Sequence, residues 1–270
     1  MISNVNRIGR FTSSKIHVLL GTGSRPMTEE ELKNHKLENP KSQKKNIDDG
    51  FSAGALTYIK QRRAERSLGR SIDTNFYNQA MSWGKFCEAY LYWKEGLLGF
   101  EYSLTSQESM LHPEYPFWAG SPDLKKKDFG SEIKCYYPEN FYNYSSVLIL
   151  EDLEKLKKDF KEEYWQIVSN ACIMGFDKGE AIAFIPTESQ LIEMRRLIEY
   201  TDFIEKNMND DQWKYRFIYE KPIEELPYIP DGIEYPNLVK FEFEIPKEDK
   251  ELLTKRVIEA EEYLISGKLI

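Results

Sequence analysis

The chain has 270 residues, of which 41% are hydrophobic and 14% aromatic, so it carries enough apolar surface to bury a core. Its 37 basic and 45 acidic residues give a net charge of −8, and that total taken alone argues against a nucleic-acid-binding protein. The charge is unevenly distributed, however: residues 1–70 hold 14 Lys and Arg against 7 Asp and Glu, whereas residues 71–270 hold 23 against 38. The basic N-terminal part therefore keeps nucleic acid open as a partner.

The sequence argues against a membrane-spanning or secreted protein. No stretch approaches the roughly 20 consecutive apolar residues of a membrane span, and the first residues lack the apolar core of a signal peptide. Cys87, Cys135 and Cys172 are far apart and odd in number, which suits a reducing cytosol rather than a disulfide framework. They also lack the paired spacing of zinc or iron–sulfur ligands. We therefore expect a cytoplasmic protein with no membrane partner.

The first part of the chain is predicted to be mainly helical. Ser13 or Ser14 is expected to cap a short helix that runs to residue 20. Residues 21–50 are rich in Gly, Pro, Asn, Lys and Glu and indicate a loop or a partly helical insertion. Two helices are expected next, over residues 53–68 and 74–98, where apolar side chains recur every three or four positions.

The rest of the chain mixes strands and helices. Strand-like segments are residues 101–106, 117–124, 130–136, 180–186 and 238–245, and helical segments are 151–175, 188–207 and 247–265. No internal repeat or long linker divides the chain, so residues 1–270 are expected to form one domain. The pattern predicts an α/β fold with a central mixed β-sheet flanked by helices.

Three residues in the middle of the chain carry the chemistry that we expect. Glu132 and Lys134 are two apart on a predicted strand, so their side chains leave the same face. If the strand that ends near Asp123 pairs with it as a hairpin, two carboxylates and one ammonium meet. Two hard oxygen donors suit Mg²⁺, and a lysine beside a metal-bound water positions it or offsets charge on a phosphate. These are the groups needed for phosphodiester hydrolysis.

The alternative interpretation is an exposed hairpin with ordinary surface charges. The apolar flanks Ile133 and Cys135 place the Glu–Lys pair beside a buried face, which favours a site. Upstream, Glu88 lies among apolar residues of a predicted helix, where a charge is costly unless it is paired or bound to metal. A surface ion pair with Lys85 or Lys94 is the alternative for Glu88.

With these motifs in place, the chain resembles the phage-type exonucleases of the lambda exonuclease and YqaJ viral recombinase family, in the PD-(D/E)xK nuclease superfamily. The matching segments occur in order at Arg7–Ser14, Ser82–Glu88, Ala119–Asp123, Glu132–Lys134 and Tyr164–Gln166. The resemblance implies a restriction-endonuclease-like core. It places the motifs within residues 7–190 and leaves residues 191–270 as a C-terminal extension without a motif.

The resemblance implies a role for each of five catalytic residues. Asp123 and Glu132 correspond to the metal ligands, and Glu88 to the helix-borne acid that joins the metal site directly or through water. Lys134 corresponds to the catalytic lysine. Gln166 corresponds to a glutamine that supports the site from a following helix, with a buried structural hydrogen bond as its alternative role.

The resemblance also implies that Arg7, Ser14 and Ser121 bind the terminal 5′-phosphate of DNA. A guanidinium and hydroxyl groups suit phosphate oxygens. The alternatives are a solvated charge for Arg7 and a helix cap for Ser14. The chain departs from the family pattern two residues after Gln166, where members often have a second glutamine and this chain has Val168.

Three other segments offer further contacts to DNA. The basic helix over residues 60–70 is the better candidate for contacting the DNA backbone, and Lys125–Lys127 are either a second contact or a solvated turn. The aromatic residues Tyr136, Tyr137, Phe141, Tyr142 and Tyr144 either stack on unpaired bases or pack in the protein, and we favour packing.

Together these features predict a Mg²⁺-dependent deoxyribonuclease, with Mn²⁺ as a substitute, that acts as a 5′→3′ exonuclease on duplex DNA ends. The resemblance implies a phage or prophage recombination role in a bacterial cytoplasm, with a single-strand annealing protein as partner and a homo-oligomer as an open possibility. An endonuclease of the same fold is the first alternative. A non-catalytic DNA-end-binding protein is the second, and the complete set of Asp123, Glu132 and Lys134 argues against it.

Overall fold

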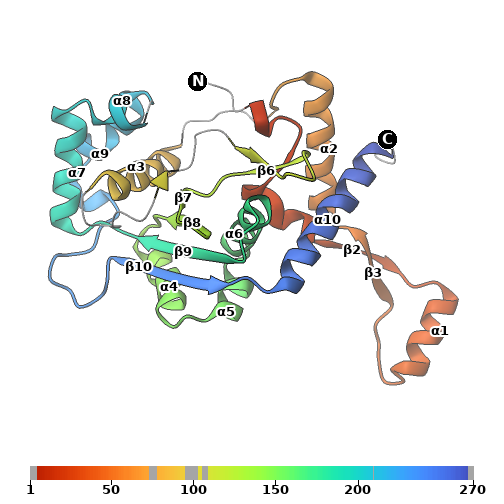
Figure 1. The fold of residues 1–270 in the computed structure, drawn as a ribbon. Coiled ribbons are helices and arrows are strands. Elements are labelled where there is room, and N and C mark those ends of the chain that lie inside the picture. Colours follow the sequence, from red (N-terminus) through yellow and green to blue (C-terminus); the bar gives the residue numbers. More distant parts are fainter. Residues whose placement is uncertain (1–4, 73–77, 95–102, 105–108, 209, 267–270) are drawn as a thin grey trace.

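The computed structural model describes residues 5–72, 78–94, 103–104, 109–208 and 210–266. Its centre is a five-stranded sheet in which β8 and β9 are parallel and the other neighbours are antiparallel (Figure 1). Across the sheet the strands are β10 (Leu238–Glu244), β9 (Lys178–Phe184), β8 (Phe129–Lys134), β7 (Leu124–Lys125) and β4 (Ser103–Leu104). The predicted mixed sheet is therefore confirmed.

Helices cover both faces of this sheet, and β9 is apolar on both sides. On β9, Ala181 and Ala183 belong to one buried cluster, whereas Ile182 and Phe184 belong to the other. The first cluster includes side chains of α4 (Pro138–Ile149), α5 (Leu153–Asp159), α6 (Lys161–Met174) and α10 (Lys247–Ile265). The second includes side chains of α3 (Gln79–Trp93), α7 (Glu188–Tyr200), α8 (Phe203–Met208), η3 (Gln212–Tyr215) and α9 (Phe217–Glu220). A short 3₁₀ helix, η4 (Ile223–Glu225), follows α9.

A small second sheet joins the N-terminal segment to the segment that leads into Asp123. Its strands are, in order, β1 (Phe11–Thr12), β6 (Trp118–Gly120) and β5 (Met110–Leu111). β1 and β6 are parallel, with Thr12 opposite Ala119. In the chain, the 3₁₀ helix η1 (Val5–Arg7) precedes β1 and the 3₁₀ helix η2 (Ser13–Leu20) follows it. The helix α2 (Ala53–Leu68) packs against η2.

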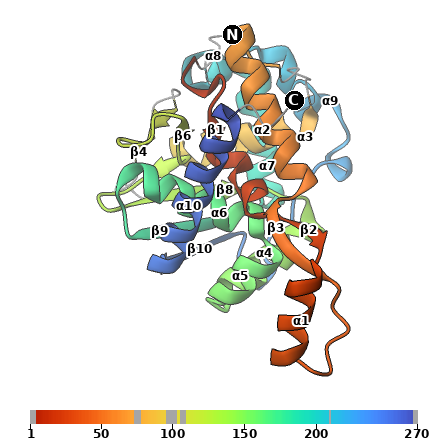
Figure 2. The same ribbon diagram turned by 90° about the vertical axis from the view of Figure 1, so that its right-hand side faces the viewer.

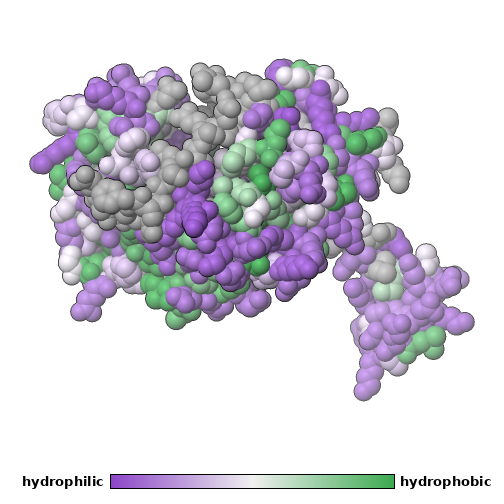
Figure 3. Space-filling model, in the orientation of Figure 1, coloured by the Kyte–Doolittle hydropathy of each residue, from purple (hydrophilic) through white to green (hydrophobic). Residues whose placement is uncertain are grey.

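Residues 22–51 form an arm that projects from the body (Figures 1 and 2). The arm is an antiparallel pair, β2 (Thr22–Pro26) and β3 (Asn46–Phe51), with α1 (Glu29–Glu38) at its tip. Its surface is mainly hydrophilic (Figure 3), and α1 has no buried residue. The prediction of a loop or partly helical insertion missed the hairpin because these strands bury little and show no clear apolar alternation.

Several predicted boundaries need correction. The helices at 53–68 and 247–265 are confirmed, but the predicted helix at 151–175 is two helices that meet at Phe160, whose backbone is not helical (φ −123°, ψ 55°). The predicted helix at 188–207 likewise divides after Tyr200. The N-cap of η2 is Thr12 and makes no side-chain cap bond, so the capping role of Ser13 or Ser14 is wrong.

Of the predicted strand 101–106, the structure describes residues 103–104, which form β4. Of the predicted helix 74–98, it describes residues 78–94, which include α3. The other residues of both predictions lie outside the described residues. Among the described helices, none combines the length and the apolar character that crossing a membrane requires.

Candidate active site

The hairpin of β7 and β8 places Asp123 beside Glu132. The backbone N–H of Asp123 donates to the carbonyl of Ser131 at 3.1 Å, and the Asp123 carboxylate accepts from the N–H of Ile133 at 2.8 Å. The carboxyl groups of Asp123 and Glu132 are close enough to share a hydrogen bond. The predicted strand over residues 117–124 is divided: β6 belongs to the small second sheet, and only β7 pairs with β8. The predicted hairpin is therefore correct for residues 124–125, and this short pairing brings the two acids together.

Glu132 is completely buried and faces α6. Gln166 Nε2 donates to its Oε2 at 2.7 Å, and Asn170 Nδ2 donates to its Oε1. Gln166 and Asn170 are four residues apart, so they share one face of α6. The two amides thus hold both oxygens of the Glu132 carboxylate from one helix.

Lys134 lies on the same face of β8, as the alternation predicted. Its Nζ donates to Gln166 Oε1 at 3.3 Å and lies 4.0 Å from Glu132 Oε2. Ile133, between them, faces the opposite way and packs in the cluster beneath α3. Gln166 therefore contacts both Glu132 and Lys134, so both of its side-chain hydrogen bonds lie within the candidate site.

Glu88 reaches this site from α3. Its helix neighbours Phe86, Cys87 and Tyr90 are buried in the cluster against the sheet, which fixes the face on which Glu88 points. Glu88 lies within electrostatic range of Asp123 and Lys134. Of its two alternative partners, Lys94 forms an ion pair with Glu193 of α7 instead, whereas Lys85 lies within electrostatic range of Glu88 and acts to lower its pKa.

Burial raises the pKa values of all three acids, and like charge raises those of Glu132 and Glu88 further. Burial raises the pKa of Glu132 well above its ordinary value, and the Asp123 carboxylate raises it further. The pKa of Glu88 is raised well above its ordinary value by burial and then by Asp123. Burial also raises the pKa of Asp123, against the opposing effect of Lys134. A bound cation relieves both repulsion and desolvation in a cluster of this kind.

Burial alone lowers the pKa of Lys134, but the surrounding carboxylates, Glu132 and then Asp123, outweigh it and raise that pKa above its ordinary value. Lys134 is therefore an ammonium ion at neutral pH. It serves the site as a fixed positive charge and a hydrogen-bond donor.

Among the residues that the structure describes, no group of three or more His, Cys, Asp or Glu side chains is arranged to hold a metal ion. The chemistry of Asp123 and Glu132 nevertheless fits Mg²⁺, which often takes one or two protein carboxylates and completes its shell with water and phosphate oxygens. Metal ligation by Asp123, Glu132 and Glu88 stays a prediction.

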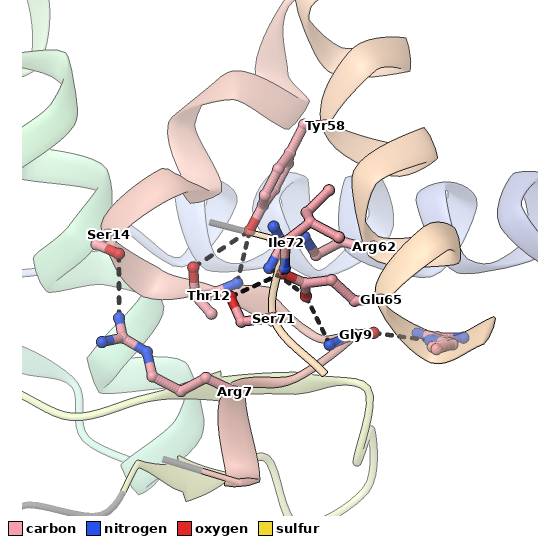
Figure 4. Close-up of polar contacts among 10 residues, drawn as sticks. Arg7, Gly9, Thr12, Ser14, Tyr58, Arg62, Glu65, Ser71 and Ile72 are labelled. Carbon is pink, nitrogen blue, oxygen red and sulfur yellow. Dashed lines mark hydrogen bonds and ion pairs between the residues drawn. The ribbon is translucent and has the colours of Figure 1, made fainter. Parts of the chain in front are cut away.

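The structure also brings together the predicted phosphate-binding residues Arg7 and Ser14. Arg7 Nη2 donates to Ser14 Oγ at 3.1 Å (Figure 4). Thr12 pairs with Ala119 in the parallel register of β1 and β6, but β1 ends there and Ser14 already lies in η2, so the strand pairing does not place Ser121. A shared phosphate site that includes Ser121 stays a prediction.

α6 connects the acidic pair to this N-terminal segment. Ser13 Oγ lies 2.8 Å from Ser169 Oγ, and Asn170, the next residue along α6, holds Glu132. Gly120 lies between Ser13 and Asn170. A Cβ at this position would lie 1.9 Å from Ser13 Oγ and 2.6 Å from Asn170 Oδ1, so the packing leaves no room for a side chain.

Asn170 is the site residue that the sequence reasoning missed. The family comparison directed attention to Val168, which the structure places fully buried in the core. The available signal was helical spacing, because a polar residue four positions after Gln166 shares its face.

Some predicted DNA contacts prove to be structural. In α2, Arg62 is buried and pairs with Glu65 at 2.9 Å, and Arg66 binds the carboxylate of Glu261 with both Nη atoms at 2.7 Å. The interpretation of residues 60–70 as a row of backbone-contacting charges is therefore wrong for these two arginines. Lys126, in the turn between β7 and β8, lies 3.9 Å from the buried Glu180 carboxylate.

The aromatic residues after β8 divide by exposure. Phe141 and Tyr144 are buried in the core, and Tyr136 donates a hydrogen bond to Glu163. Packing, the favoured interpretation, is correct for these residues. Tyr137 and Tyr142 are exposed.

No protein-family model matches the chain, and no curated protein matches it in sequence. Solved structures do match. LHK-Exo in complex with dAMP is 12% identical, with a TM-score of 0.53 over 97% of this chain and 91% of that one. A second structure of LHK-Exo, described as an alkaline exonuclease from Laribacter hongkongensis, is 13% identical, with a TM-score of 0.50 over 97% and 93%. A phage-related exonuclease from Haemophilus somnus 129PT is 13% identical, with a TM-score of 0.52 over 95% and 94%.

These matches extend over nearly the whole chain, so the likeness is one of complete folds rather than of a shared sheet. The chain has the fold of the alkaline and phage-related exonucleases, with a restriction-endonuclease-like core.

Proposed function

We propose that the protein is a metal-dependent deoxyribonuclease that digests duplex DNA from its ends in the 5′→3′ direction. The observation that carries the proposal is the arrangement of Asp123, Glu132 and Lys134 around Gln166. The fold shared with exonucleases supports it independently.

Asp123 and Glu132 are the residues that would hold Mg²⁺ or Mn²⁺, with Glu88 joining directly or through water. When bound, the metal supplies an activated water and stabilises charge on the scissile phosphate. The amides of Gln166 and Asn170 orient the Glu132 carboxylate and leave lone pairs on each oxygen for a ligand. Lys134 places a positive charge where the phosphate develops negative charge.

The end of the DNA is the ligand that we assign to Arg7, Ser14 and Ser121. The Arg7–Ser14 hydrogen bond brings a guanidinium and a hydroxyl next to each other, and both groups bind phosphate oxygens well. One structural neighbour is an exonuclease in complex with dAMP, which supports a nucleotide ligand for this fold.

Digestion of matched linear and closed-circular duplexes tests the proposal. With Mg²⁺ or Mn²⁺ the purified protein is expected to degrade the linear form from its 5′ ends and to leave intact circles untouched. EDTA should stop the reaction, and Lys134→Ala should reduce it strongly. Cleavage of intact circles would instead identify an endonuclease. Binding of DNA ends without any digestion would identify a non-catalytic end-binding protein.

The proposed cellular role is phage or prophage recombination in a bacterial cytoplasm, with a single-strand annealing protein as partner. A phage-related exonuclease among the structural neighbours supports this setting. Co-expression with a phage single-strand annealing protein, followed by co-purification and mass measurement, tests both the partner and a homo-oligomer.

A further inference from the structure

The turn between Arg7 and Ser14 is held at a single glycine. Gly9 is buried and has a φ of +67°. Its N–H donates to Glu65 Oε2 at 2.8 Å (Figure 4), and its carbonyl accepts from Arg66 Nε at 2.7 Å. Two consecutive residues of α2 therefore hold Gly9 by both its N–H and its carbonyl, and we call these three residues the Gly9 clamp.

Glu65 is an unusual residue for this task, because its side chain is only 1% exposed. Besides Gly9, its carboxylate accepts from the N–H of Ile72 at 3.1 Å and from Ser71 Oγ at 3.3 Å, and it pairs with the buried Arg62 at 2.9 Å. A buried carboxylate is costly unless it is saturated with donors. Here the donors come from three segments, so the carboxylate ties the turn, α2 and the chain after α2 together.

The other half of the clamp is anchored just as firmly. Arg66 continues from Gly9 to the Glu261 carboxylate of α10, which it binds with both Nη atoms. A Cβ on Gly9 would lie 2.5 Å from Arg66 Cγ, so only glycine fits in the clamp. Two turns earlier on α2, the Tyr58 hydroxyl accepts from the N–H of Thr12 at 2.8 Å and so fixes the same segment further along.

We propose that the Gly9 clamp is a positioning device for end recognition, with Glu65 as its central residue. This inference rests on the assignment of Arg7 and Ser14 to the terminal phosphate. Arg7 is exposed, and a free arginine loses much rotamer freedom when it binds a ligand. The clamp fixes the backbone two residues after Arg7 and five before Ser14, so the guanidinium is held at the hydroxyl before DNA arrives.

If Glu65 only stabilised the fold, its substitution would lower the folded fraction and weaken the binding of every DNA by the same factor. If Glu65 positions Arg7, its substitution lowers selectively the preference for a 5′-phosphate over a 5′-hydroxyl. That preference is a ratio of two affinities measured on one preparation, so a change in the folded fraction cancels from it.

The experiment is equilibrium binding of two fluorescent duplexes, identical except for a 5′-phosphate or a 5′-hydroxyl, by anisotropy in EDTA. The wild type is expected to prefer the phosphate, and Arg7→Ala to abolish that preference. Glu65→Gln is expected to lower the preference to the Arg7→Ala level, with binding of the hydroxyl duplex kept within about twofold. The double variant should lower it no further, because both changes remove one function. An unchanged ratio in Glu65→Gln would overturn the proposal.

Two further variants keep the test decisive if Glu65→Gln fails to fold. Arg66→Met leaves Glu65 in place but removes the bond to the Gly9 carbonyl, and it should lower the ratio in the same direction. Lys60→Met, on the exposed face of α2, is the matched control and should change both affinities alike. A normal ratio in Arg66→Met would count against the clamp.

The assay also separates this inference from the proposed nuclease activity. Because binding is measured without divalent metal, it does not depend on catalysis. A wild type that digests DNA but binds both duplexes equally would remove the role of Arg7 and the clamp while leaving the nuclease. A wild type that prefers the phosphate but digests nothing would support end recognition by Arg7 and remove the proposed nuclease activity.

Discussion

Asn170 donates a hydrogen bond to Oε1 of Glu132, on the oxygen opposite the one that Gln166 binds. The buried carboxylate is therefore fixed in plane and direction by two amides of one helix. Outer residues that orient a ligand in this way commonly matter for activity nearly as much as the ligand itself.

Asn170→Ala is therefore expected to lower kcat by roughly 10- to 100-fold with a smaller change in KM, because Glu132 loses one of its two orienting donors. Steady-state digestion of a linear duplex measures both constants. Val168→Ala is the matched control on the same helix. It should cost roughly 1–3 kcal/mol of stability through a core cavity and leave kcat unchanged. Equal kcat in Asn170→Ala and the wild type would show that Asn170 does not serve the site.

Gly120→Ala tests the close packing between the two halves of the site. The added methyl group meets Ser13 Oγ and Asn170 Oδ1, so we expect a loss of roughly 1–3 kcal/mol of stability and a fall in activity. Gly84→Ala provides the control, because nothing lies within 4 Å of its Cβ position in α3. That change should raise stability by about 0.5–1 kcal/mol. Thermal denaturation of the two variants compares them, and equal stabilities would contradict the packing described.

The sequence was sufficient to predict the hairpin that carries the acids. Glu132 and Lys134 alternate with Ile133, and strand alternation is a local property that survives folding. Asp123 could be placed next to them because the turn between the strands is short. The helix at residues 247–265 was predictable for the same reason, since its apolar face repeats at helical spacing.

What could not be predicted depends on partners far away in the sequence. Arg66 counts as a free positive charge until the fold brings Glu261 to it, 195 residues later. The burial of Arg62 could not be predicted either, because the sequence around it is basic and is typical of an exposed helix face. A loop or partly helical insertion was predicted for the arm, but its hairpin was missed because β2 buries little and shows no apolar alternation.

The arm should respond to acid through Glu31. Its hydrogen bonds with Arg25 and with Thr28 lower the pKa of Glu31 from 4.5 to about 2. A depressed carboxyl pKa contributes stability that is complete above pH 4.5 and is lost as the pH falls toward 2. Helical Cα chemical shifts of α1 are thus expected to hold between pH 7 and 5 and to decline below pH 4.5. Glu31→Gln should remove the pH dependence, and an unchanged decline in that variant would refute the assignment.

Asp123→Asn is expected to abolish digestion and, in EDTA, to raise the melting temperature. The substitution removes one of two buried like charges, which relieves the repulsion that raises the pKa of Glu132. Mg²⁺ should stabilise the wild type, by about 1.4 kcal/mol at ten times its Kd, and should leave the variant unchanged. Thermal melts with and without Mg²⁺ give the comparison. Equal stabilisation of both proteins would mean that the metal binds elsewhere.

We propose that Asp123 and Glu132 together form the metal site of this protein. A crystal soaked in Mn²⁺ tests this proposal most directly through the anomalous signal of the metal. We expect a peak within about 2.0–2.6 Å of carboxylate oxygens from both residues. A peak bound by other residues, or none at saturating Mn²⁺, would contradict it.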